Sequence, residues 1–325
     1  MIKSGFKFLA ASILLLSVVS CNNDDDSEDL GNWITQSVFD GSPRSSAVSF
    51  VINNFGYVGT GYDGDDYLND FWQYDMDGNY WIQKADFPGE DRSSASAFTI
   101  GNKGYIGTGY NGTDELSDFY SYDSESNTWT QIADFAGTPR RAAVGFESDS
   151  YGYVGSGFDG DNDRKDFWKY DPVSNAWEEL LGFGGNKRRE AITFTIGNMV
   201  YFGTGTSNGV YVTDFWSFNT DTEIWTRLRD VDYEDDYSVE RSNASAFAIG
   251  NYGYVCGGDN LAGVWEYNPA NDTWDSKTNI EASVRQDAVA FSTGARGFVL
   301  LGKYGNYYYD DMYELKPFDE QEDDD

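Results

Sequence analysis

Six arginines recur in register along the chain, and a guanidinium group can fork onto a carboxylate or bond several carbonyl oxygens at once. Each arginine precedes an apolar run such as residues 47–52. Two roles fit this pattern: a ring of arginines around a ligand, or guanidinium groups that bond loop carbonyls between repeated units. We favour the structural role, because function in a repeat protein is usually carried by irregular positions. The arginines are Arg44, Arg92, Arg140, Arg188, Arg241 and Arg285.

The residues directly after these arginines differ from copy to copy. Arg141 follows Arg140, and Arg189 with Glu190 follows Arg188. These three residues form the one irregular cluster of basic and acidic side chains, so acid–base chemistry would have to use them. The other copies carry hydroxyl, amide or acidic groups, namely Ser45-Ser46, Ser93-Ser94, Ser242-Asn243 and Gln286-Asp287.

The composition excludes several kinds of site. The chain has no histidine, which removes His-containing catalytic triads and imidazole metal sites. The carboxylates of Asp159, Asp161 and Asp163 alternate as in calcium loops, but no glycine follows at the sixth position and no glutamate at the twelfth. We therefore favour a solvated turn there, with calcium as the alternative, and expect neither a metal nor a cofactor. We interpret Asp70, Asp118, Asp166 and Asp214, which recur before the aromatic segments, as turn and strand-start residues.

The N-terminus has the pattern of a secreted lipoprotein. Lys3 and Lys7 precede an apolar run over residues 8–19 that is too short to span a membrane. It ends in Val18-Val19-Ser20-Cys21, which resembles a bacterial lipobox, so residues 1–20 are predicted to be a signal peptide and Cys21 the lipidated residue. The alternative is ordinary cleavage beside an incidental cysteine. Cys256 is then the only other cysteine, and its apolar segment favours a core residue.

An acidic tract follows Cys21 and continues the lipoprotein pattern. We interpret residues 21–31 as a solvated tether, and the tract resembles the surface-export signal of Bacteroidota lipoproteins. The predicted location is the outer membrane, exposed at the cell surface, with a periplasm-facing lipoprotein as the alternative. The full chain has a net charge of −33, and cleavage would leave 20 basic and 55 acidic residues, or −35. Such a charge disfavours nucleic acid and anionic membrane surfaces, and favours cations or basic partners.

Four short strands repeat in each unit. The first is apolar, the second contains glycines, as in Tyr57-Val-Gly-Thr-Gly61, and the third is aromatic, as in Asp166-Phe-Trp-Lys-Tyr170. The fourth begins with tryptophan, at Trp33, Trp81, Trp129, Trp177, Trp225 and Trp274, with spacings of 48, 48, 48, 48 and 49 residues. Units of this kind are typical of β-propeller blades. The sixth unit lacks its tryptophan strand, so residues 32–36 are predicted to complete it and close the ring.

These motifs resemble the Kelch repeat: a paired-glycine strand, an aromatic strand and a tryptophan that opens the outer strand. The expected fold is an all-β, six-bladed propeller over residues 32–318, followed by a disordered acidic tail over 319–325. One departure is that Gly-Thr-Gly or Gly-Ser-Gly replaces adjacent glycines in four copies.

The Kelch resemblance implies that the loops joining strands two to three and four to one line a binding face. On this face it places Tyr62, Tyr110, Phe158, Tyr304, Arg141, Arg189 and Glu190. Aromatic faces and guanidinium groups there would suit a glycan or a protein ligand. The chain is thus expected to be a monomeric, non-enzymatic binding protein. The alternative is an enzyme resembling the Kelch-type sialic acid mutarotases, whereas copper chemistry of the galactose-oxidase type would need histidines.

Overall fold

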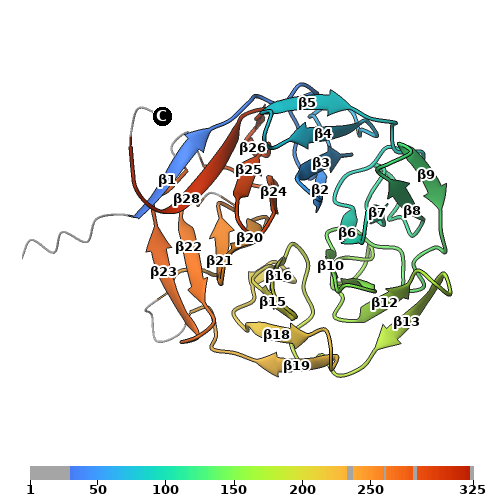
Figure 1. Ribbon diagram of the computed structural model, residues 1–325. Coiled ribbons are helices and arrows are strands. Elements are labelled where there is room, and N and C mark those ends of the chain that lie inside the picture. The colour runs from blue at the N-terminus through green and yellow to red at the C-terminus, as the bar shows by residue number, and fades with distance from the viewer. Residues whose placement is uncertain (1–29, 233–236, 260, 281–283, 323–325) are drawn as a thin grey trace, which may run out of the picture.

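The computed structural model describes residues 30–232, 237–259, 261–280 and 284–322. Within these ranges six four-stranded antiparallel sheets stand around a central axis like the blades of a propeller (Figure 1). Cys21 and the predicted signal peptide lie outside the described residues. No helix among the described residues is long and apolar enough to cross a membrane.

Each blade runs outward from an inner strand near the axis, and the strand bounds follow blade by blade. Blade 1 contains β2 (Val48–Ile52), β3 (Phe55–Gly59), β4 (Phe71–Asp75) and β5 (Tyr80–Gln83). Blade 2 contains β6 (Ser96–Ile100), β7 (Lys103–Gly107), β8 (Phe119–Asp123) and β9 (Thr128–Gln131). Blade 3 contains β10 (Val144–Glu147), β11 (Gly152–Gly155), β12 (Phe167–Asp171) and β13 (Ala176–Leu180).

Blades 4 and 5 follow the same order. Blade 4 contains β14 (Ile192–Ile196), β15 (Met199–Gly203), β18 (Trp216–Asn219) and β19 (Ile224–Arg227), with the small hairpin β16 (Thr206–Ser207) and β17 (Val210–Tyr211) inserted. Blade 5 contains β20 (Ser245–Ile249), β21 (Tyr252–Cys256), β22 (Val264–Asn268) and β23 (Thr273–Lys277). Cys256 is buried in β21, as expected of a core residue, and burial raises the pKa of its thiol.

The last blade is closed by the N-terminal strand, as the unpaired tryptophan strand predicts. Blade 6 contains β24 (Val289–Ser292), β25 (Gly297–Leu300), β28 (Met312–Glu320) and β1 (Leu30–Thr35), with the hairpin β26 (Lys303–Tyr304) and β27 (Tyr307–Tyr308) inserted. Trp33 of β1 pairs with Leu315 of β28, and Figure 1 shows the blue β1 beside the red β28. The ring therefore joins the two ends of the chain within one sheet.

The two strands of this seam extend into segments expected to be irregular. Leu30 pairs with Glu320, so β1 takes Leu30 and Gly31 from the predicted tether and β28 takes Asp319 and Glu320 from the predicted tail. The amide of Glu322 also donates a hydrogen bond to Oδ1 of Asn32 at 3.1 Å. These residues form regular strands despite their acidic surroundings, because the two segments pair with each other in antiparallel fashion.

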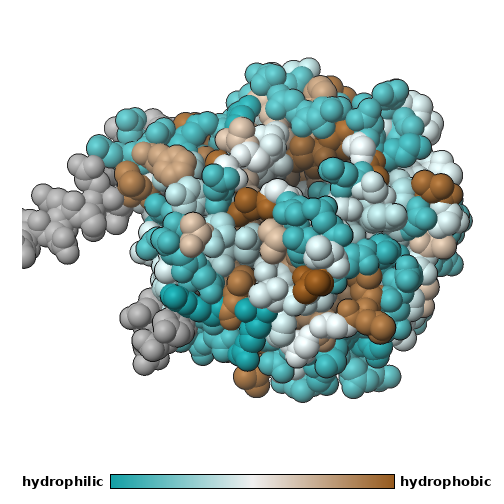
Figure 2. Space-filling view, turned by 60° about the horizontal axis from the view of Figure 1, so that its bottom comes forward, coloured by the Kyte–Doolittle hydropathy of each residue, from teal (hydrophilic) through white to brown (hydrophobic). Residues whose placement is uncertain are grey.

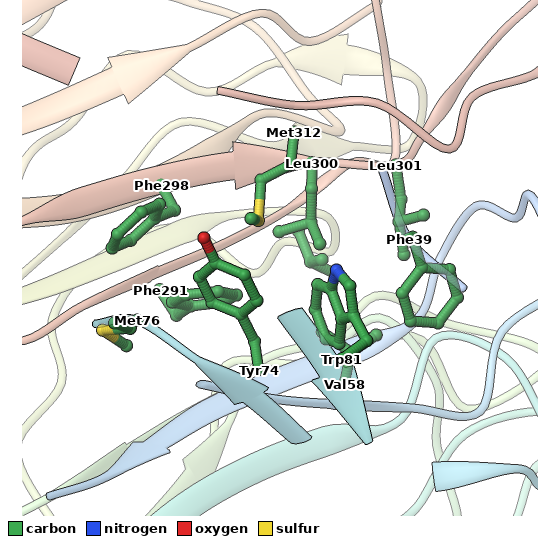
Figure 3. Packing of buried hydrophobic residues seen from close by; sticks show 11 residues of the cluster. Phe39, Val58, Tyr74, Met76, Trp81, Phe291, Phe298, Leu300, Leu301 and Met312 are labelled. Atoms are coloured by element: carbon green, nitrogen blue, oxygen red, sulfur yellow. The ribbon is translucent and has the colours of Figure 1, made fainter. Parts of the chain in front are cut away.

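Aromatic side chains fill the space between blades. In Figure 3, Tyr74 and Trp81 of blade 1 face Phe291, Phe298 and Met312 of blade 6 in one buried cluster. The rings of Tyr74 and Phe298 lie 5.8 Å apart and nearly perpendicular, an arrangement that aromatic pairs favour. The outer surface is different: Figure 2 shows a largely hydrophilic face with apolar residues in separate patches.

Glycines in the second strands let the blades approach one another. A Cβ at Gly104 of β7 would lie 2.1 Å from the ring of Phe50 in blade 1, and one at Gly56 of β3 would lie 2.6 Å from Phe291 in blade 6. Each phenylalanine therefore packs directly on the backbone of the next blade. This contact explains why the glycines recur with the period of the fold.

Candidate functional site

The arginines in register belong to the framework of the blades. Arg44 is fully buried; its Nη1 donates a hydrogen bond to the oxygen of Thr60 at 3.0 Å, and its guanidinium forms a two-pronged ion pair with Asp70. Equivalent ion pairs join Arg92 to Asp118, Arg140 to Asp166 and Arg285 to Asp311. Arg188 pairs with the carboxylate of Asp214 through Nη2 and bonds the main-chain oxygen of Asp214 through Nη1. The recurring aspartates are therefore partners of the arginines, a role that the sequence did not predict.

These contacts agree with the structural role expected for the arginines, with one difference. The guanidinium group bonds carbonyls of its own blade, whereas the main-chain oxygen of the arginine makes the contact between blades. The amide of Gly61 donates to the oxygen of Arg92 at 2.7 Å, and the amide of Gly302 donates to the oxygen of Arg44 at 2.8 Å and closes the circle.

A ring of six residues surrounds one end of the propeller axis, and we call this end the mouth. All six have a left-handed backbone with φ between 51° and 57°, which is uncommon for residues other than glycine. Five amide-to-carbonyl hydrogen bonds of 2.8–3.1 Å link successive members around the axis. The bonds hold the side chains in fixed positions at the mouth. The ring consists of Ser46, Ser94, Ala142, Glu190, Asn243 and Asp287.

A cavity of about 180 Å³ lies at the mouth, lined by the ring, by Arg141 and by a second layer of small residues. That layer consists of Ala95, Ala143, Ala191, Ala244 and Ala288. Below it the inner strands line an axial channel that ends in a lower cavity of about 370 Å³ on the opposite face. Among the described residues that line this lower cavity, Glu147 alone is charged, and burial raises its pKa.

Aromatic and guanidinium groups form a continuous belt beside the mouth. The rings of Tyr308 and Tyr62 lie 6.3 Å apart, those of Tyr62 and Tyr67 4.9 Å, and those of Tyr67 and Tyr110 5.9 Å. The belt continues through two guanidinium groups stacked on aromatic faces. We give the name aromatic belt to these four tyrosines together with Phe158 and the guanidinium groups of Arg141 and Arg189. The aromatic belt crosses blades 6, 1, 2, 3 and 4.

The two arginines of the belt are held by stacking and by carboxylates. The guanidinium carbon of Arg141 lies 4.4 Å from the ring centroid of Tyr110 and 5.2 Å from that of Phe158. Arg189 covers the same phenylalanine at 4.5 Å. Such contacts are worth about 0.5–1 kcal/mol at exposed sites and more when desolvated.

Carboxylates lie beside each of these two arginines. Nη1 of Arg141 lies 3.1 Å from Oε1 of Glu115. Nε of Arg189 lies 3.6 Å from Oδ1 of Asp163 and 3.8 Å from Oε1 of Glu190. Among the described residues this Nε has no hydrogen-bond acceptor in bonding geometry, although it is buried. The side chains of Arg141 and Arg189 are 32% and 27% exposed, so part of each remains accessible to a ligand.

Acidic groups gather on the other side of the mouth. Burial raises the pKa of Glu190 against the opposing charge of Arg189, and the nearby carboxyls of Asp287 and Asp259 raise it further. Burial likewise raises the pKa of Asp287, although Lys303 opposes this with its Nζ 3.6 Å from Oδ2. The mouth thus has a guanidinium side on blades 3 and 4 and a carboxyl side on blades 4 to 6.

The sequence matches the model of the Kelch motif over residues 91–136, which span most of blade 2. Among solved structures, that of YjhT superposes with a TM-score of 0.72 at 15% sequence identity, and the match covers 86% of this chain and 96% of that one. The fold is a six-bladed β-propeller, and blade 2 carries a Kelch motif. At 15% identity, the similarity to YjhT shows a shared fold and nothing more. No curated protein matches the sequence.

The propeller brings six of the seven predicted ligand-binding residues together at the mouth. Tyr62, Tyr110, Phe158, Arg141 and Arg189 belong to the aromatic belt, and Glu190 belongs to the ring. Tyr304 pairs with Tyr307 in the hairpin of blade 6 and is 53% exposed. Tyr308, four residues further on, makes the belt contact in that blade.

Sequence reasoning missed one residue of the belt and two carboxylates that pair with its arginines. Tyr67, Glu115 and Asp163 each form an isolated bridge with a predicted residue five positions earlier: Tyr62, Tyr110 and Phe158, respectively. This five-residue spacing recurs at the same place in blades 1 to 3. It is the one sequence signal that could have identified them.

The alternating aspartates of the loop after Phe158 have separate partners. Oδ1 of Asp159 accepts hydrogen bonds from the amides of Asp161 and Asn162, and its Oδ2 pairs with Arg164 at 3.2 Å. Asp163 turns to the amide of Asn208 at 2.6 Å and to Arg189. Among the described residues no group of three or more Cys, Asp or Glu is placed to hold a metal. These contacts fit a turn closed by its own side chains.

Proposed function

We propose that this Kelch propeller is a non-enzymatic binding protein of the cell envelope that recognises a glycan or a protein at the mouth. The observation that carries the proposal is the aromatic belt, in which Arg141 and Arg189 are stacked on rings and stay partly exposed, with Arg141 lining the cavity at the mouth. Prepositioned aromatic and guanidinium groups reduce the entropy lost on binding.

The belt suits two kinds of ligand surface. Half-exposed tyrosine faces can cover the apolar face of a sugar ring or a proline-rich segment. A guanidinium group can donate to a carboxylate, a sugar hydroxyl or a peptide carbonyl. These groups vary among blades while the framework arginines repeat, as expected of a recognition surface on a repeat fold.

The anchoring part of the proposal rests on Cys21, and the strand order supports its direction. Leu30 pairs with Glu320 at one end of the blade 6 sheet, and Thr35 pairs with Tyr313 at the other end. Tyr313 lies two residues after Asp311, the partner of Arg285, so the Thr35 end faces the mouth and Leu30 lies away from it. Cys21 lies nine positions before Leu30, a reach of about 30 Å when fully extended. An anchored propeller would then present its mouth away from the bilayer.

A second candidate function is acid–base catalysis on a sugar. One observation favours it: the carboxyl of Glu190 faces a cavity, beside Arg189, with its pKa raised by burial. A carboxyl with a raised pKa can act as a general acid or base. Under this alternative, Glu190 would transfer the proton and Arg189 would orient the substrate.

A glycan array followed by calorimetry separates the two functions. The expected result is saturable binding of a sugar. Proton NMR should show that the anomer ratio and the structure of this sugar stay unchanged. Accelerated anomer exchange that disappears in Glu190→Gln would replace the binding function with the catalytic one. An array without saturable binding, together with an envelope pull-down without a retained protein, would contradict the proposal.

A further inference from the structure

Blades 4 to 6 carry exposed apolar side chains around the carboxyl side of the mouth. Two small hairpins, β16–β17 and β26–β27, occur only in blades 4 and 6 within the described chain. Val210 and Tyr211 of the first are 68% and 45% exposed, and Tyr304 and Tyr307 of the second are 53% and 64% exposed. Leu261, in the loop of blade 5 between them, is 39% exposed. We call these five residues the apolar rim.

The apolar rim surrounds carboxyl groups whose negative charge is only partly balanced by neighbouring cationic side chains. Asp259 raises the pKa of Tyr211 through a hydrogen bond, so the hairpin of blade 4 contacts the loop of blade 5. Asp259 also accepts hydrogen bonds from Ser242 and Asn243, which are neutral partners. Glu190 and Asp287 share the mouth with Arg189 and Lys303, and Arg189 is already paired with Asp163.

The cavity at the mouth is small for a whole ligand. Its volume of about 180 Å³ lies below the roughly 300–1,000 Å³ of common small-molecule sites. A single long side chain fits such a volume, while the rest of its molecule must lie on the surrounding surface. The exposed tyrosines of the apolar rim supply that surface, because tyrosine is enriched among the residues that dominate protein–protein affinity.

We propose that the apolar rim and the mouth bind an extended basic segment of a partner protein, with a lysine or arginine side chain inserted between Glu190 and Asp287. The segment lies between the two hairpins, and its apolar side chains cover Tyr304, Tyr307 and Tyr211. This inference rests on the proposed function of the mouth and names its ligand. The overall charge of −33 adds long-range attraction for a basic partner.

A displayed library of random 12-residue peptides, selected on the wild-type protein in 150 mM salt, tests the proposal. Selected peptides should contain Lys or Arg in excess over Asp and Glu. The best peptide, synthesised with a fluorescent label, should bind the Glu190→Gln/Asp287→Asn protein at least tenfold more weakly. Tyr307→Ala, at a side chain too exposed to affect folding, should also weaken binding several-fold.

A matched control removes the same charge elsewhere. Asp149→Asn/Asp319→Asn changes two exposed carboxylates on the opposite face and should leave peptide affinity within twofold. An equal loss in this control would show general electrostatic attraction and overturn the site. Selection of peptides without basic residues would overturn it as well. Saturable glycan binding with no enriched peptide would overturn the peptide ligand and keep the mouth as a binding site, whereas absence of both would contradict the proposed function too.

Discussion

The indole Nε1 of Trp33 donates a hydrogen bond at 3.2 Å to the main-chain oxygen of Thr278, a residue 245 positions further along the chain. Trp33 is fully buried against Leu315 and Val299 of blade 6 and Ile280 of blade 5. One side chain from the start of the chain thus fastens the last blade to its neighbour. The closure of the ring depends on contacts of this kind, because the strand that carries them comes from the other end of the chain.

Trp33→Ala should lower the free energy of unfolding by about 3–5 kcal/mol, the usual cost of removing a buried tryptophan. Denaturant titration followed by circular dichroism measures this. The matched control is Phe318→Ala, at an aromatic side chain that is 60% exposed on the partner strand and should cost less than about 1 kcal/mol. A loss of less than about 1 kcal/mol for Trp33→Ala would mean that the seam does not depend on this side chain.

Cys21→Ala should move the protein from the membrane fraction to the soluble fraction, because the predicted lipid would no longer be attached. Cys256→Ala is the control: this cysteine is buried in β21, so its replacement should leave the protein in the membrane fraction. Immunoblots of fractionated cells give the answer. Retention of both variants in the membrane would contradict the lipoprotein prediction.

Protease treatment of intact cells tests the predicted surface exposure. Wild-type protein at the cell surface should be cleaved, and a periplasmic marker should not. A protected wild-type protein would mean that the acidic tract after Cys21 is a spacer and that the propeller faces the periplasm.

Tyr110→Ala and Arg189→Ala should each weaken binding of a glycan identified by the array at least tenfold, or about 1.4 kcal/mol. Both side chains belong to the aromatic belt. The first substitution removes a stacked aromatic face, and the second removes a set of hydrogen-bond donors. Tyr80→Ala, on the outer strand of blade 1, serves as the control and should bind normally. Unchanged affinity in both belt variants, measured by calorimetry, would place the ligand elsewhere.

Acid should weaken the fold through the buried Arg–Asp pairs. Burial opposes ionisation of Asp166, but the hydrogen bonds and charge of Arg140 outweigh it and lower the pKa of Asp166 from 3.8 to about 2. A carboxyl with a depressed folded-state pKa stabilises the fold above its unfolded pKa, and this contribution is lost as the pH falls from about 4 to about 2. The difference amounts to roughly 2 kcal/mol for this residue.

Asp70 is affected in the same direction, with burial again opposing Arg44. Unfolding free energies measured between pH 6 and pH 2 should fall for the wild type. They should fall by about 2 kcal/mol less for Asp166→Asn, which starts from a lower stability because Arg140 loses its partner. Asp161→Asn, at an exposed carboxylate of the neighbouring loop, should follow the wild type. Identical slopes for Asp166→Asn and the wild type would contradict the assigned role of the ion pair.

The repeat period determined the architecture, since tryptophans 48 residues apart can only mark equivalent strands of identical units, and a single unmatched strand at Trp33 must complete the sixth. Each blade is a local sequence of four strands, so its pattern is readable without knowing what lies beside it. The same reasoning placed Cys256 in the core and assigned the six arginines to the framework.

Only the tertiary structure decided which side chains meet across blades. Arg44 reaches Asp70, 26 residues away, because the strands of blade 1 fold back on one another. Arg141 stacks on Tyr110 of the preceding blade, because the rotation between blades sets that distance and the sequence does not record it. The belt contact of Tyr308 in place of Tyr304 depends on the register of one small hairpin, where a shift of one residue turns every side chain to the other face. Glu147 lines the lower cavity because it is the last residue of β10, at the end of this inner strand that lies away from the mouth.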